Sequence, residues 1–148
     1  MIVEAMIAFV IALVALIGIL NLANRSVATS GTAVRAARAT GYADETIEWL
    51  KNQKAVLGWH DFLQKSDPAG VFYCLDELIL DASKVYDPAV GDCTALIAGT
   101  TEYTRMLILR TSIVGGKTLV TAQVTVGWFV TGAQLENVNR QYEFVQGG

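Results

Sequence analysis

Residues 1–20 form the apolar segment MIVEAMIAFVIALVALIGIL. From Ala5 to Leu20 it contains no charged and no strongly polar side chain. An α-helix over residues 1–20 would be about 30 Å long, close to the thickness of the hydrocarbon core of a bilayer. A helix that is apolar on all sides needs lipid or other protein surfaces around it.

Three ordinary interpretations of this stretch are open. A secretory signal peptide has a basic start, a shorter apolar run and a small-residue cleavage site. Residues 26–28 resemble such a cleavage site weakly, but the start of the chain holds Glu4 and no basic residue. A buried core helix is a second interpretation, although an all-round apolar helix at a terminus is an awkward core element. A single-pass membrane anchor is the third, and it leaves the acid unexplained.

Glu4 is the only charged residue before Arg25. A charge in hydrocarbon costs a few kcal/mol, so an acid in such a segment indicates a functional role and a cationic partner. If the start of the helix lies in water instead, Glu4 is a first-turn acid that the helix dipole favours, and it needs no further explanation.

The pattern MIVEAMIAFVIAL, followed by more apolar residues and an amphipathic continuation, resembles the N-terminus of the type IV pilin and pseudopilin family. In that family a prepilin peptidase removes a leader after a glycine and methylates the new N-terminus. The family's glutamate stands one residue further from the mature N-terminus than Glu4 stands from Met1. Either the numbering here starts one residue into the mature chain, or this protein is one residue shorter.

The resemblance implies a structural subunit of a type IV pilus-like extracellular filament, with no enzymatic activity and no cofactor. The implied partners are copies of the chain in a helical filament, the inner membrane before assembly, and the pilus assembly machinery. The assembled filament would lie on the cell surface. Residues assigned to assembly by the resemblance are Met1, Ile2, Val3, Glu4 and Phe9, with the Glu4 carboxylate beside the terminal ammonium of a neighbour.

Two alternatives stay open beside a major pilin. A minor pilin or a type II secretion pseudopilin would share every feature described so far. A single-pass membrane-anchored binding domain, or one with an unrecognised enzymatic site, belongs to a different class. Loss of assembly on substitution of Glu4 would separate a filament subunit from a plain anchor.

Four regions are predicted: an apolar helix over 1–24, its amphipathic continuation over 25–58, a variable connecting region over 59–102, and an antiparallel sheet over 103–148. The expected fold class is α+β, a long N-terminal helical spine packed on a small antiparallel sheet, as in pilins. The helix is expected to end near Gly58. Many family members carry a proline that loosens the helix; here the nearest substitutes are Gly18, Asn21 and Asn24.

The continuation of the helix mixes small residues with a helical pattern. Glu45, Glu48, Lys51 and Lys54 mark its solvated side, and Glu48 with Lys51 has the spacing of an i to i+3 ion pair. The predicted apolar stripe consists of Val27, Val34, Ala37, Ile47, Leu50 and Val56.

Alternation at period two predicts the sheet from about Tyr103 onward. A hairpin should turn at Gly115 and Gly116. In its second strand one face should be apolar and buried: Val120, Ala122, Val124, Val126, Trp128 and Val130. A third strand should follow, with Val138, Tyr142 and Phe144 on one face. The amphipathic half of the helix is the expected cover, with Trp49 and Trp128 as large core residues.

Cys74 and Cys93 are the only cysteines. A zinc site lacks ligands, because His60 is the only histidine and lies upstream of both. In the extracytoplasmic domain that the resemblance implies, two cysteines favour a disulfide, which would contribute about 3 kcal/mol to stability. Two buried free thiols are the alternative.

The remaining motifs predict no enzyme and no nucleic-acid partner. His60 with Asp61 lacks a nucleophile in a motif, and GGKT at Gly115 lacks the first glycine of a phosphate-binding loop. The formal net charge of −3 gives no basic surface, although an assembled array could gather lysines at 51, 54 and 65. A solvated acidic loop is favoured over a calcium site for Asp76, Glu77, Asp81, Asp87 and Asp92.

Overall fold

The computed structural model describes residues 2–78, 93–130 and 134–146. Its elements are α1 (Ile2–Leu63), β1 (Val71–Cys74), β2 (Tyr103–Val114), β3 (Lys117–Val130) and β4 (Gln134–Val145). The chain forms two compact units, residues 1–36 and 37–148, which are described separately. The predicted α+β class is confirmed.

Helix α1 changes direction at Gly58, which has φ 78° and ψ 167°. Glycine adopts this positive φ without the steric cost of a Cβ atom, so it separates the long helix from a short segment over 59–63. The predicted stop near Gly58 is confirmed, and the extra helical segment was missed. The backbone is helical throughout residues 18–24. Loosening of the helix there in an assembled subunit stays a prediction.

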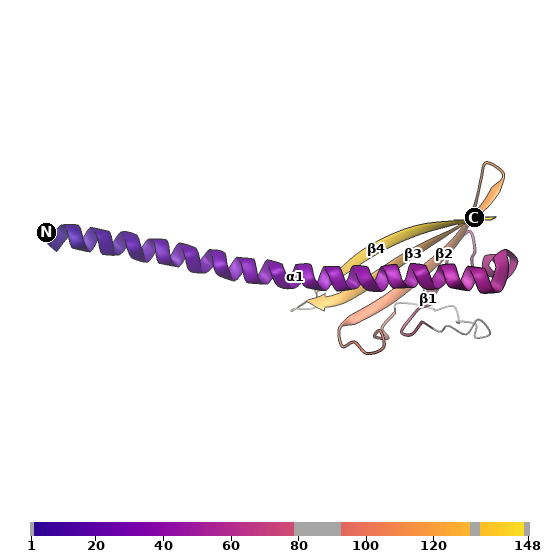
Figure 1. The fold of residues 1–148 in the computed structure, drawn as a ribbon, viewed down its shortest axis with the longest axis horizontal. Coiled ribbons are helices and arrows are strands. Elements are labelled where there is room, and N and C mark those ends of the chain that lie inside the picture. Colours follow the sequence, from indigo (N-terminus) through magenta and orange to yellow (C-terminus); the bar gives the residue numbers. More distant parts are fainter. Residues whose placement is uncertain (1, 79–92, 131–133, 147–148) are drawn as a thin grey trace. The chain divides into compact units, whose positions relative to one another are not determined.

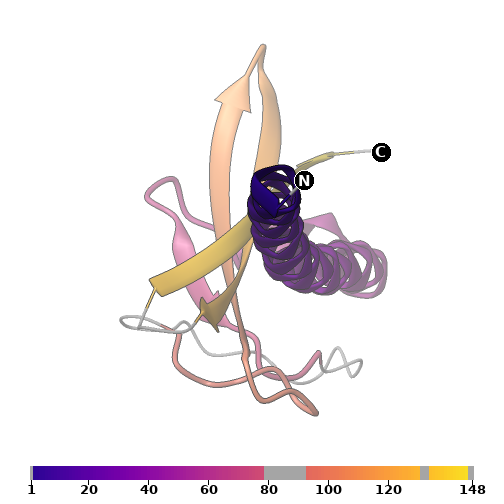
Figure 2. The same cartoon turned by 90° about the vertical axis from the view of Figure 1, so that its left-hand side faces the viewer.

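The sheet has the order β1-β2-β3-β4, and all neighbouring strands are antiparallel. The β2–β3 hairpin turns at Gly115 (φ 59°) and Gly116 (φ 76°), as predicted. Two successive positive φ values are those of a type I′ turn, whose twist matches that of the flanking strands. Figure 2 shows the tip of this hairpin projecting past the other strands. Strand β1 falls in the predicted connecting region and was missed.

The core of the second unit lies between the sheet and the part of α1 from residue 37 onward, which crosses the strands in Figure 1. Trp49 is 4% exposed and Trp128 is 2% exposed, so both predicted core residues are confirmed. The Phe62 and Phe144 rings meet edge to face with centroids 5.0 Å apart. The predicted buried face of β3 is also confirmed from Val120 to Trp128; the Val130 side chain lies outside the described part.

On β4 the prediction of one apolar face is only partly fulfilled. Phe144 is 3% exposed, whereas Tyr142 is 38% exposed and Val138 is half-buried. All three pair with buried positions of β3, so their register is as predicted. Arg140 lies between them on the same face and approaches Asp44 Oδ1 with its Nε at 3.4 Å. The edge of the core is therefore more polar than the sequence pattern indicated.

The predicted stripe on α1 is wrong in part. Ile47 and Leu50 are buried, but Ala37 is exposed, Val34 is 50% exposed and Val56 is 69% exposed; the Val27 side chain lies outside the described part. The buried positions recur at spacings of three and four residues: Ala39, Ala43, Thr46, Leu50 and Gln53. The contact face therefore combines the small residues Ala39, Ala43 and Thr46 with the large side chain of Leu50, and the small residues are those that the predicted stripe left out.

Candidate assembly surface

The first unit consists of the helical residues 2–36, and its side chains are mostly apolar and exposed. Thirteen large hydrophobic side chains between Val3 and Leu22, called the apolar surface below, have exposed fractions from 43% at Leu13 to 74% at Leu22. They are Val3, Met6, Ile7, Phe9, Val10, Ile11, Leu13, Val14, Leu16, Ile17, Ile19, Leu20 and Leu22.

The apolar surface has no polar side. Phe9, Val10 and Ile11 are 65%, 57% and 64% exposed. Successive residues of an α-helix point about 100° apart, so three in a row already cover most of its circumference. Complete burial of one such side chain contributes about 1.5–3 kcal/mol. Exposed apolar patches of this kind mark sites of association with proteins or lipids.

Of the residues assigned to assembly, Val3 (70% exposed) and Phe9 belong to the apolar surface. Glu4 and Ile2 lie in the first turn of α1, but their side chains are outside the described part, as is Met1. The structure therefore does not test the pairing of the Glu4 carboxylate. No helix in the residues that the structure describes is found to be long and apolar enough to cross a membrane.

Of the positions assigned to loosening of the helix, Gly18 and Asn21 lie within the stretch that carries the apolar surface, and Asn24 follows it. Gly18 and Asn21 are exposed, and the Asn24 side chain is not described. A Cβ atom added at Gly18 would meet no atom within 4 Å. Packing inside a single subunit therefore does not require a glycine at this position.

The second unit confirms the predicted disulfide between Cys74 and Cys93, whose Cα atoms are 5.2 Å apart. The bridge joins the end of β1 to the segment that precedes β2. Asp76 and Glu77 are exposed, whereas Asp81, Asp87 and Asp92 lie outside the described residues. Within the described ranges, no group of three or more metal-binding side chains is found.

His60 is an exposed residue in the last turn of α1. Its Nε2 atom lies 3.1 Å from Nε2 of Gln64, one turn further along the chain. This geometry is that of a polar contact at a helix end.

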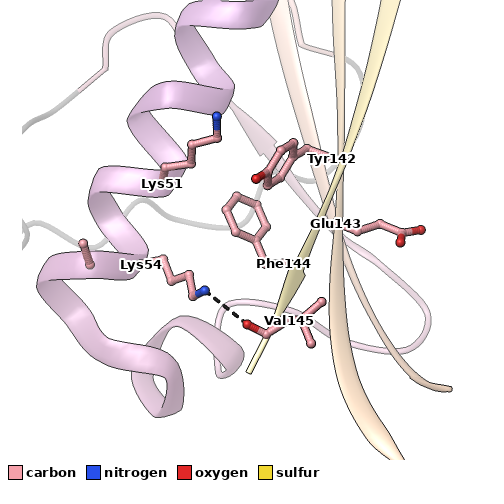
Figure 3. Close-up of a pocket in the computed structure, with 7 residues that line it drawn as sticks. Lys51, Lys54, Tyr142, Glu143, Phe144 and Val145 are labelled. Atoms are coloured by element: carbon pink, nitrogen blue, oxygen red, sulfur yellow. Dashed lines mark hydrogen bonds between the residues drawn. The ribbon is translucent and has the colours of Figure 1, made fainter. Parts of the chain in front are cut away.

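Two lysines of the predicted solvated side hold α1 against β4 and line a hollow of about 430 Å³ (Figure 3). Lys51 Nζ donates to Glu48 Oε1 at 2.6 Å, which confirms the predicted pair and raises the pKa of Lys51. The same ammonium lies 4.8 Å from the ring centroid of Tyr142. Lys54 Nζ donates to the carbonyl oxygen of Val145 at 3.1 Å. Both ammonium groups thus stabilise the domain and are not merely solvated.

Comparisons with protein-family models, with curated proteins and with solved structures found no match for the chain. What the chain does must therefore be inferred from its own residues. Contacts within the second unit account for Lys51, Lys54 and both cysteines. The apolar surface of α1 has no such explanation, because it is exposed over its whole length.

Proposed function

We propose that the chain is a structural subunit of a type IV pilus-like filament and that it polymerises through the apolar surface of α1. The exposure of that surface is the observation that carries the proposal. The same surface on other copies is the simplest cover, because helices packed side by side can bury apolar residues on every side. A cell-surface filament, with an inner-membrane stage before assembly, belongs to the same proposal.

The second unit supports an arrangement in which the apolar surface packs inside the filament and the folded domain lies on its outside. Its buried residues begin at Ala39, so its core is complete without the apolar surface. A domain with its own core can be carried on the outside of a filament while the first half of α1 packs in the interior. The surface of the domain would then decide what the filament contacts.

Glu4 supplies alignment in this proposal. A carboxylate about 4 Å from a neighbour's terminal ammonium gains roughly 4 kcal/mol at an effective dielectric constant of 20, before the cost of desolvation is subtracted. The net gain is small. A subunit docked one step out of register would bury an unpaired charge, however, which costs about 3–5 kcal/mol. The apolar surface provides adhesion, and Glu4 selects the position.

The test is electron microscopy of the purified full-length chain after detergent removal, with the variant Glu4→Ala and the matched control Asp61→Ala. Asp61 is an exposed acid at the other end of α1. We expect thin filaments from the wild type and from Asp61→Ala, and none from Glu4→Ala, while circular dichroism shows all three folded. Chains that stay dispersed singly in lipid, in the wild type and in both variants alike, would instead identify a membrane-anchored domain.

A further inference from the structure

The face of the sheet that points away from α1, called the helix-distal face below, carries a concentration of uncharged hydrogen-bonding side chains. Alternate residues of a strand point to opposite faces, and the even-numbered residues of β3 from Val120 to Trp128 are buried on the face that packs on α1. The odd-numbered residues of β3 and their β4 partners therefore form the helix-distal face. Its central polar members are Thr121, Gln123 and Thr125 on β3, and Asn137, Asn139 and Gln141 on β4.

The register places these side chains in three successive rows across the sheet. One row joins Thr104, Gly127 and Asn137; the next joins Met106, Thr125 and Asn139; the third joins Ile108, Gln123 and Gln141. Rows on one face are about 7 Å apart along a strand. None of these nine residues is charged. Along the described strands, charged side chains come in the following row, where Arg110, Thr121 and Glu143 are paired, and at Lys117 beside the hairpin turn.

Part of this face is held in place by its own hydrogen bonds. Thr125 Oγ1 donates to Asn139 Oδ1 at 2.5 Å, and Asn139 Nδ2 donates to Asn137 Oδ1 at 3.3 Å. The Asn137 side-chain NH₂ group and the side-chain amides of Gln123 and Gln141 have no hydrogen bond within the described part of the chain. Each amide offers donors and an acceptor together.

Two hollows lie along the helix-distal face. The first, of about 410 Å³, includes Thr104, Thr125 and Asn137 in its lining and is bordered by Phe129, which is 58% exposed. The second, of about 280 Å³, includes Gln123, Gln141 and, at its far end, Arg110. Together they follow the three rows and extend beyond them at both ends, to Phe129 in the first hollow and to Ser112 in the second.

Gly127 keeps the first hollow open. A Cβ atom added there would lie 3.3 Å from Thr104 Oγ1 and 3.4 Å from Leu135 Cδ1. Both contacts are tighter than, or at the limit of, ordinary packing. Any larger residue at this position would occupy the space beside the Thr104 and Leu135 side chains and make the first hollow smaller.

The lining selects a chemical class of ligand. A charged ligand would find no partner of opposite charge in the three rows and would lose hydration on binding. The next row carries one charge of each sign, Arg110 and Glu143, so it favours neither an anion nor a cation over a neutral ligand. An apolar ligand would leave the amides without hydrogen bonds, which is equally unfavourable. A neutral polyhydroxylated chain avoids both losses. It carries no charge to desolvate, each of its hydroxyls can donate to and accept from the amides, and the apolar face of a sugar ring can pack on Phe129.

We propose that the helix-distal face is a binding site for a neutral polysaccharide, with Gln123, Gln141 and Asn137 as hydrogen-bonding residues and Phe129 as the packing surface. The site lies on a different part of the chain from the apolar surface of α1. It is therefore independent of whether the chain polymerises.

The experiment uses the full-length chain in detergent and titrates it with neutral hexasaccharides of β-1,4-glucose, β-1,4-N-acetylglucosamine, α-1,4-glucose and α-1,6-mannose. A hexamer of α-1,4-galacturonate is the charged comparison. We expect at least one neutral hexamer to bind and to shift the side-chain amide NMR signals of Gln123 and Gln141. The galacturonate hexamer should bind more weakly than that neutral hexamer.

Three variants test the residues: Gln141→Ala, Phe129→Ala and Gly127→Ala. Loss of one hydrogen bond or of the packing surface should weaken binding about fivefold or more. Asn52→Ala removes an exposed amide from α1 and should leave the affinity unchanged, which makes it the matched control. Circular dichroism verifies that every variant is folded.

Three results would overturn the proposal: no neutral hexamer binds the folded wild type at millimolar concentration, the three variants bind as the wild type does, or the charged hexamer binds most tightly. Electron microscopy of the same variants separates this site from filament formation. If Gln141→Ala abolishes filaments in a chain that binds no saccharide, the face is a contact between copies of the chain.

Discussion

The guanidinium Nε of Arg105 donates to the carbonyl oxygen of Leu75 at 2.9 Å, and the Arg105 side chain is only 2% exposed. Its Nη1 atom also donates to Thr46 Oγ1 at 3.3 Å and lies 3.6 Å from Glu45 Oε2. Arg105 therefore connects β2, α1 and the segment after β1. Burial lowers the pKa of Arg105, and the nearby Glu45 carboxylate opposes this effect.

We predict that Arg105→Met lowers the free energy of unfolding by about 2–4 kcal/mol, because the carbonyl of Leu75 loses a charge-assisted hydrogen bond inside the core. Chemical denaturation measures the change. Arg110→Met on the same strand is the control, since Arg110 is exposed, and its effect should stay within about 0.5 kcal/mol. Equal effects of the two substitutions would show that the Arg105 contacts do not stabilise the fold.

Gly116→Ala should lower the free energy of unfolding by about 1–2 kcal/mol, because alanine is strained at the φ of 76° that the hairpin requires. Gly41→Ala should instead raise the free energy of unfolding. Gly41 is exposed in α1, and an added Cβ atom there meets nothing within 4 Å, so alanine should stabilise by about 0.5–1 kcal/mol. Thermal melting measures the stability of both variants. A Gly116→Ala variant as stable as the wild type would contradict the assignment of the turn.

Replacing both Cys74 and Cys93 with alanine should lower the free energy of unfolding by about 3 kcal/mol, the loss expected for a bridge that closes a loop of this length. A reducing agent should bring the wild type to the same stability and leave the variant unchanged. Titration of the native protein with a thiol reagent should find no free thiol. Two reactive thiols per chain would contradict the disulfide.

Stability should fall as the pH rises from about 10 to about 12, in part because of Tyr73. Burial raises the pKa of Tyr73 from 10.0 to about 12, and its hydroxyl donates to the carbonyl oxygen of Lys65 at 2.6 Å. In this interval the unfolded chain loses the proton that the folded chain keeps, so a rise in pH favours unfolding.

Tyr73→Phe has no such group to titrate, and the decline of its stability with pH should be less steep. The variant should be less stable than the wild type at neutral pH, because it lacks the hydrogen bond to Lys65. Denaturant unfolding at a series of pH values measures both effects. Parallel curves for the two proteins would contradict a raised pKa at Tyr73.

The elements with strong local signals could be predicted from the sequence. The β2–β3 hairpin follows from alternation on both sides of Gly115 and Gly116, and the end of the long helix follows from Gly58. The burial of Trp128 follows from its even position in β3. Each of these depends on neighbouring residues alone, so the chain carries the information locally.

The Cys74–Cys93 disulfide was predicted, but other features that depend on distant partners were not. Strand β1 has only four residues and is defined by its register with Met106–Leu109 of β2, far along the chain. The contact face of α1 depends on how closely the sheet approaches Ala39 and Ala43. Burial of Arg105 could have been inferred from its odd-numbered position in β2, since Tyr103, Leu107 and Leu109 share its face and are buried.

The account requires that copies of the chain bind one another through the apolar surface and that the Glu4 carboxylate pairs with the terminal ammonium of a neighbouring copy. Solid-state NMR of assembled material measures this directly when half the copies carry ¹³C in the Glu4 carboxyl group and half carry ¹⁵N in the terminal amine of the mature chain. We predict magnetisation transfer between the two labels, which requires different copies to be in contact. Absence of transfer in well-ordered assemblies would contradict the account.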